Sequence, residues 1–140
     1  MTPSSDFGIY HIDTLHLHQF LHVWRHIHND FPPAKTIGKN AQFYQDLCYR
    51  ALDECIGNIT TSVHEPTQGH ITFPIQYNDA VRTLVIARRL RRAHPDNIAY
   101  IRYWKDACNT HANMFIRGIN EAARQPVHPL IPRRASFAVL

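Results

Sequence analysis

The stretch of sequence that decides the fold class runs from residue 78 to residue 124 and reads NDAVRTLVIARRLRRAHPDNIAYIRYWKDACNTHANMFIRGINEAAR. Apolar residues recur every three or four positions on both sides of His94-Pro95, which is the spacing of a buried helix face. Asn78-Asp79 can cap a first helix, and Asp96-Asn97 can cap a second that is about 40 Å long at 1.5 Å per residue. This stretch therefore predicts a helical hairpin.

Two further helices are predicted upstream by the same spacing of apolar residues, over residues 13–28 and 40–56. Asp13-Thr14 can cap the first of them, and Gly57 stands where a glycine commonly ends a helix in the left-handed conformation. Residues 71–75, which follow these helices, alternate in polarity. The proline in this run favours an edge strand, because proline cannot donate to a ladder.

The order of these elements predicts an all-α fold: an antiparallel up-down four-helix bundle over residues 1–124, with a small β element between the second and third helices. Residues 125–140 contain three prolines and predict an extended tail with an apolar end. No run reaches the ~18–20 apolar residues of a membrane span, and residues 1–13 lack the basic and apolar regions of a secretory signal. We therefore expect a protein that stays in the compartment where it is made and has no membrane partner.

The chain has three cysteines, Cys48, Cys55 and Cys108, and no Cys-x-x-Cys pair. The odd number of cysteines argues against a disulfide framework, and the lack of a Cys-x-x-Cys pair argues against a cysteine zinc site. All three fall in predicted helices, so we expect them to act as small buried hydrophobic residues.

Six of the eleven histidines lie between His11 and His28. His18, His22 and His26 are spaced by four residues, so they share one helix face opposite the apolar one. This spacing can chelate zinc or nickel, but no carboxylate lies between the three as in a metalloprotease helix. The pattern favours a polar stripe that faces solvent or another subunit, where it could titrate at roughly pH 6–7. No metal site is predicted.

Charge is divided unevenly along the chain. Residues 1–70 carry four Lys or Arg against seven Asp or Glu, whereas residues 71–140 carry eleven against four. Arginines outnumber lysines twelve to three, a bias suited to bidentate contacts with phosphate. The second half of the chain therefore predicts a polyanionic partner.

Basic residues concentrate at the end of the third predicted helix and the start of the fourth: Arg88, Arg89, Arg91, Arg92, Arg102 and Lys105. In a hairpin these side chains converge at one end, which supplies the cation density that a nucleic acid requires. Tyr100, Tyr103 and Trp104 lie near enough in sequence to stack on bases. The alternative is a solvated helix end whose arginines complement the helix dipole; an acidic protein or a lipid surface is a further possible partner.

No arrangement of residues in the sequence predicts catalysis. Asp53-Glu54 closes the second helix and Asp79 opens the third, so we expect these acids near each other at the strand end, but nothing else suggests a glycosidase-like pocket around them. The sequence contains neither a nucleophile elbow nor a glycine-rich phosphate loop. We therefore expect no enzyme, no cofactor and no small-molecule substrate.

Five short strings follow one another in a recognisable order. They are Thr2-Pro3-Ser4, Thr72-Phe73-Pro74, Tyr77-Asn78-Asp79-Ala80-Val81, Arg102 with Lys105-Asp106-Ala107, and Arg134-Ala135-Ser136-Phe137. In this order they resemble the coat proteins of rod-shaped plant RNA viruses, the tobacco mosaic virus-like family, over nearly the whole chain. The chain departs from that family in its short loop after Arg92 and in Lys105, which replaces an aspartate.

The resemblance implies a structural protein that polymerises into a helical rod around single-stranded RNA, in the virion and the host cytoplasm. It implies that the clustered arginines contact phosphates and that Asp106 lies near a ribose. It also implies that Glu54 and Asp79 face acids of adjoining subunits, where repulsion promotes disassembly.

Two other functions stay open on the sequence. The chain is alternatively a small basic helical accessory subunit of a larger ribonucleoprotein or organelle complex, with its tail as a docking arm. The third interpretation is a metal-dependent enzyme built on the three histidines of the stripe.

Overall fold

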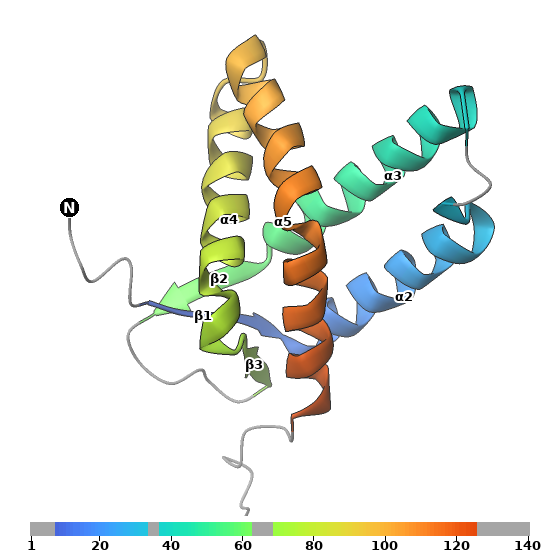
Figure 1. Ribbon diagram of the computed structural model, residues 1–140. Coiled ribbons are helices and arrows are strands. Elements are labelled where there is room, and N and C mark those ends of the chain that lie inside the picture. The colour runs from blue at the N-terminus through green and yellow to red at the C-terminus, as the bar shows by residue number, and fades with distance from the viewer. Residues whose placement is uncertain (1–7, 34–36, 63–68, 126–140) are drawn as a thin grey trace, which may run out of the picture.

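The computed structural model describes residues 8–33, 37–62 and 69–125. Within these ranges the chain forms four α-helices and a small three-stranded sheet (Figure 1). The elements are β1 (Ile9–Asp13), α2 (Thr14–Asp30), α3 (Lys39–Ile56), β2 (Ile59–Ser62), β3 (His70–Thr72), the 3-10 helix η2 (Ile75–Tyr77), α4 (Asn78–Ala93) and α5 (Ile98–Arg124). The predicted predominance of helix is confirmed. The predicted tail lies outside the described residues from Pro126 onward.

The strand predicted over residues 71–75 is found as β3 at the edge of the sheet, but it ends at Thr72. The N–H of Phe73 still donates to the Tyr10 carbonyl oxygen at 2.8 Å. Pro74 then has no N–H with which to continue the ladder. The hydrogen bonds to β1 therefore stop at Pro74, and the side chain of the preceding Phe73 is buried in the core.

The sheet has the order β2-β1-β3, with both neighbours antiparallel to β1. The prediction that the β element lies between the second and third helices is therefore wrong for its central strand, which precedes α2. β1 has only five residues and ends at Asp13, the N-cap of α2, so its short alternation was not predicted as a strand. Tyr10 and Ile12 are buried on its core side, whereas His11 and Asp13 lie on the opposite side.

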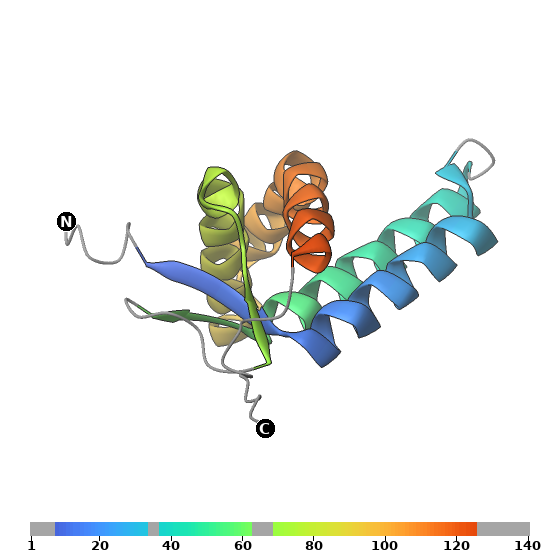
Figure 2. The same cartoon turned by 90° about the horizontal axis from the view of Figure 1, so that it is seen from below.

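The helices form two hairpins that meet at the sheet. Figures 1 and 2 show α4 beside α5 and α2 beside α3, with the α2–α3 pair running away from the α4–α5 pair beyond the sheet. The turn between α4 and α5 lies at the end of that hairpin farthest from the sheet (Figure 1). The sheet and the α4–α5 turn thus occupy opposite ends of the α4–α5 hairpin.

The core joins both hairpins to the sheet through aromatic side chains. Phe115 of α5 is fully buried, with its ring centroid 6.0 Å from that of Phe20 and 5.6 Å from that of Phe73. The residues that helical spacing assigned to buried faces line this core: Leu17, Phe20, Ile27, Ala51, Leu52, Cys55, Val81, Leu84, Trp104, Cys108, Phe115, Ile119 and Ala122. Periodicity therefore predicted the buried face of every helix.

The predicted helix ends are only partly confirmed. The side chains of Asp13 and Asn97 accept hydrogen bonds from the backbone N–H groups of His16 and Tyr100, as expected of N-caps. The cap predicted at Asn78 is wrong, because its amide donates to the Gly8 carbonyl oxygen at 3.3 Å and makes no cap for α4. The prediction that Gly57 ends α3 in the left-handed conformation is also wrong, because its φ is −63°.

Candidate nucleic-acid interface

The basic residues predicted to bind RNA flank the α4–α5 turn. Residues 88–106 contain six Lys or Arg and two Asp, a net charge of +4. They occupy the last turns of α4 and the first turns of α5, at the end of the hairpin far from the sheet (Figure 1). The hairpin therefore brings together the cations on which the sequence prediction rested.

Three of these cations are open to solvent. Arg89, Arg102 and Lys105 are exposed, and none of them forms an ion pair or hydrogen bond with another described residue. Asp106, next to Lys105, is exposed as well. These side chains can reach a polyanion without breaking any contact within the described part of the chain.

Arg88 is held by α3 instead. Its Nε donates to the backbone carbonyl oxygen of Asp53 at 2.7 Å and lies 3.2 Å from Asp53 Oδ1. Its guanidinium covers Gly57, where an added Cβ would lie 2.5 Å from Nη2. Arg88 therefore fastens the end of α3 to α4, a role that the sequence analysis did not predict.

Arg92 also contacts Asp53, but only through the carboxylate. Its Nε donates to Oδ1 at 3.2 Å and its Nη2 donates to Oδ2. The hydrogen bond and charge of Asp53 raise the pKa of the Arg92 guanidinium above its ordinary value. Asp53 was predicted only as an acid at a helix end, because the packing of α3 on α4 leaves no local signal in the sequence.

Arg91 is turned inward relative to its neighbours. It is half-buried, and its Nε is shielded from solvent without a hydrogen-bond partner among the described residues. The four arginines of this cluster therefore differ: Arg89 faces solvent, Arg88 and Arg92 hold Asp53, and Arg91 is partly covered.

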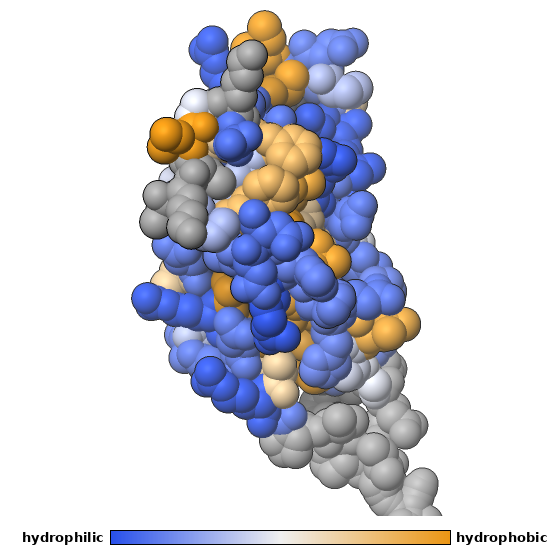
Figure 3. All heavy atoms as spheres, turned by 90° about the vertical axis from the view of Figure 1, so that its right-hand side faces the viewer, coloured by the Kyte–Doolittle hydropathy of each residue, from blue (hydrophilic) through white to orange (hydrophobic). Residues whose placement is uncertain are grey.

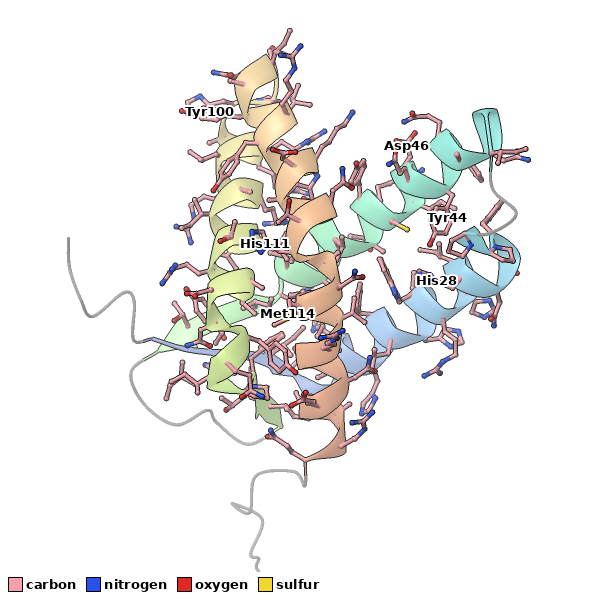
Figure 4. All side chains as sticks on the ribbon, in the orientation of Figure 1. His28, Tyr44, Asp46, Tyr100, His111 and Met114 are labelled. Carbon is pink, nitrogen blue, oxygen red and sulfur yellow. The ribbon has the colours of Figure 1, made fainter. Side chains whose placement is uncertain are left out.

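The three aromatic residues of the predicted site differ in their exposure to solvent. Trp104 is only 3% exposed and belongs to the core, so its predicted role as a stacking surface is wrong. Tyr103 is 39% exposed. Tyr100 lies beside the turn (Figure 4), with its ring centroid 5.1 Å from that of His94. Tyr100 and Tyr103 remain available for stacking.

Glu54 and Asp79 do not lie near each other in the subunit. Asp53 meets Arg88 and Arg92, which follow Asp79 on α4 by nine or more residues, or about 13 Å of helix. Asp79 pairs instead with Arg82 at 3.1 Å. The expectation that these acids meet at the strand end is wrong, because the end of α3 contacts the last turns of α4 and not its start.

The histidine stripe is exposed along α2, as expected. The ring centroids of His22 and His26 are 4.7 Å apart. Across residues 8–33, 37–62 and 69–125, no three His, Cys, Asp or Glu side chains are arranged to hold a metal ion. Cys55 and Cys108 are buried in the core as predicted, whereas Cys48 is only half-buried. Burial raises the pKa of the Cys108 thiol to about 12.

Two apolar surfaces lie on the α2–α3 hairpin. A groove of about 450 Å³ runs between the helices and includes Leu15, which is 64% exposed, and Val23. At the tip, Phe31 and Phe43 pack at 5.3 Å between ring centroids and Ile37 is 78% exposed. Figure 3 shows apolar atoms gathered on the face that this hairpin presents, surrounded by hydrophilic surface.

Comparison with known proteins finds no relative. No protein-family model matches the sequence, and neither a curated protein nor a solved structure is detectably similar to it. Among the described helices, none is both long and apolar enough to cross a bilayer. Two of the strings behind the resemblance, Thr2-Pro3-Ser4 and Arg134-Ala135-Ser136-Phe137, lie outside the described residues.

Proposed function

We propose that the chain is a structural coat subunit that packages single-stranded RNA and polymerises into a helical rod, without catalysing a reaction. The observation that carries this proposal is a set of exposed cations at one end of the α4–α5 hairpin that pair with no other described residue: Arg89, Arg102 and Lys105. A phosphate that approaches this end meets positive charge that no described carboxylate neutralises.

These cations are suited to a backbone contact and not to the reading of a base sequence. Each phosphate that an arginine or lysine neutralises releases condensed counterions, which gives a salt-dependent affinity without sequence preference. Tyr100 and Tyr103 add faces on which bases can stack. A weak affinity per subunit suffices, because many copies on one RNA act together.

Self-association is supported by the apolar surfaces of the α2–α3 hairpin. The groove at Leu15 and Val23 and the tip at Phe31, Ile37 and Phe43 are different in shape and lie apart on the same hairpin. Contact between unlike surfaces of identical subunits produces an open helical polymer when the rotation does not close a ring. Glu54 and Asp79, both exposed, are our candidates for carboxylates that face each other between subunits.

We also retain the antiparallel up-down bundle as the proposed arrangement of the helices. Each hairpin already pairs antiparallel neighbours, and Phe115 of α5 contacts Phe20 of α2 near the sheet. Closure of the α2–α3 hairpin against the α4–α5 hairpin would extend this contact along both pairs. This closure is a feature that we expect of the assembled state.

A nuclease-protection assay tests the proposal. The purified protein is mixed with single-stranded RNA, and the products are separated by gel filtration before and after ribonuclease treatment. We expect RNA to elute with a large homopolymer and to survive digestion. A protein that stays monomeric and leaves the RNA unprotected would favour the accessory-subunit alternative.

A further inference from the structure

Asp53 binds two arginines of the cluster, Arg88 and Arg92, through different sets of atoms. Arg88 is bound to the backbone carbonyl oxygen as well as to the carboxylate, and its guanidinium is packed over Gly57. Arg92 is bound by the carboxylate alone. Loss of the Asp53 charge therefore leaves Arg88 anchored but removes the ionic partner of Arg92.

Arg92 is the member of this pair that RNA could reach. Its side chain is 56% exposed, against 24% for Arg88 and 17% for Asp53. It belongs to the same last turns of α4 as Arg89, which is exposed and makes no ion pair within the described ranges. By position and exposure Arg92 resembles Arg89, but its guanidinium is paired with the Asp53 carboxylate.

We propose that Asp53 is an internal counterion that keeps Arg92 from binding RNA. Phosphates then bind Arg89, Arg102 and Lys105 at the α4–α5 end, and Arg92 stays paired with Asp53. This inference rests on the proposed RNA-binding function. Condensed counterions leave the RNA only where a protein cation neutralises a phosphate, so an arginine that stays paired with a carboxylate adds nothing to the salt dependence of binding. A phosphate can use Arg92 only by displacing Asp53.

The arrangement makes Asp53 a positioning residue for the interface. It does not touch RNA, but its charge sets the number of cations that RNA can neutralise. It also ties that number to the packing of α3 on α4, since the same carboxylate contacts both Arg88 and Arg92 of α4. A subunit in which α3 moved away from α4 would present one more arginine to the RNA.

The test is the salt dependence of RNA affinity in matched asparagine variants. Asp53→Asn is compared with Asp46→Asn, which removes a carboxylate seven residues earlier on α3 (Figure 4); Asp46 accepts a hydrogen bond from Gln42 and pairs with no described arginine. Affinity for a fluorescein-labelled oligouridylate is measured by anisotropy over a range of salt concentrations. Far-UV circular dichroism checks that both variants are folded.

We expect Asp53→Asn to steepen the plot of log affinity against log salt by about 0.7, the contribution of one additional single-strand phosphate. Asp46→Asn should leave that slope unchanged, although both variants lose one negative charge. Equal slopes in the two variants would overturn the inference while leaving RNA binding by the wild-type protein intact. A wild-type protein that does not bind RNA at any salt concentration would overturn the proposed function and this inference together.

A second comparison begins with two variants in the wild-type background, which do not depend on the stability of Asp53→Asn. In the wild-type background, Arg92→Gln should leave the salt slope unchanged, whereas Arg89→Gln should lower it by about 0.7. In the Asp53→Asn background, Arg92→Gln should abolish the added slope. If Arg92→Gln and Arg89→Gln lower the wild-type slope equally, Arg92 already binds RNA and Asp53 withholds nothing.

Discussion

The guanidinium of Arg88 occupies the place where a side chain at residue 57 would begin. A Cβ added to Gly57 would lie 2.5 Å from Arg88 Nη2 and 2.7 Å from its Cζ. The φ of Gly57 is −63°, which any residue adopts, so the backbone does not require glycine there. The restriction on residue 57 comes instead from the Arg88 side chain of α4, which must move if a Cβ is added.

The first prediction concerns this contact. Gly57→Ala should displace the Arg88 guanidinium from Asp53 and lower the free energy of unfolding by about 1 kcal/mol, a typical value for a weakened charged hydrogen bond. Urea denaturation followed by circular dichroism measures the loss. The matched background is Arg88→Ala, in which Gly57→Ala should cost almost nothing. The same cost in both backgrounds would show that the contact does not restrict residue 57.

A second glycine is predicted to be restricted by aromatic side chains. A Cβ on Gly118 would lie 3.1 Å from Tyr77 Cγ and 3.2 Å from Phe73 Cδ2. Gly118→Ala should therefore lower the free energy of unfolding by about 1–2 kcal/mol, since overpacking outweighs the helix propensity that alanine adds. Asn113→Ala, at an exposed position of α5, is the control and should stabilise the protein slightly. A gain in stability for Gly118→Ala would contradict the packing of η2 on α5.

Stability should also depend on pH through His11 in the centre of the sheet. Burial, and secondly the charge of His70, lower the pKa of His11 below its ordinary value of 6.5. The Thr60 hydroxyl lies 3.1 Å from His11 Nδ1. Because the unfolded chain then binds a proton more readily than the folded one, the free energy of unfolding should fall as pH drops below 6.5 towards the folded pKa.

Denaturation at several pH values between roughly 7.5 and 5.5 measures this dependence, in a range where aspartates are ionised. His11→Gln should flatten it, because glutamine does not titrate. His18→Gln, on the exposed stripe of α2, is the control and should leave the pH dependence of the wild type unchanged. If His11→Gln has as steep a dependence as the wild-type protein, His11 is not its source.

The fourth prediction tests the RNA-binding set. Replacement of Arg89, Arg102 and Lys105 by glutamine should lower the slope of log affinity against log salt by about 2, since about 0.7 is lost for each of three phosphates. The control removes the same charge from exposed positions elsewhere: Arg50, Arg117 and Arg124, also to glutamine. Far-UV circular dichroism should show equal helicity in both variants. Equal loss of slope would mean that RNA binding follows net charge and not the α4–α5 end.

Helical spacing predicted the elements and their buried faces, because a stripe such as Trp104, Cys108, Phe115 and Ile119 follows from local geometry. β1 escaped prediction because a five-residue strand is stable only through its partners, and the pairing of His11 with Thr60 and Thr72 bridges distant parts of the sequence. The arginine cluster lies beside the α4–α5 turn, as helical spacing predicted, and its role stays a prediction. The pairing of Arg88 and Arg92 with Asp53 was not predictable, because it depends on how α3 packs against α4.

The most direct test of the central claim is negative-stain electron microscopy of the purified protein mixed with long single-stranded RNA. We expect helical rods whose length follows the length of the RNA. We also expect that rods fail to form when Arg89, Arg102 and Lys105 are replaced by glutamine. Fields of isolated subunits at high protein concentration, with the RNA free in solution, would contradict this claim.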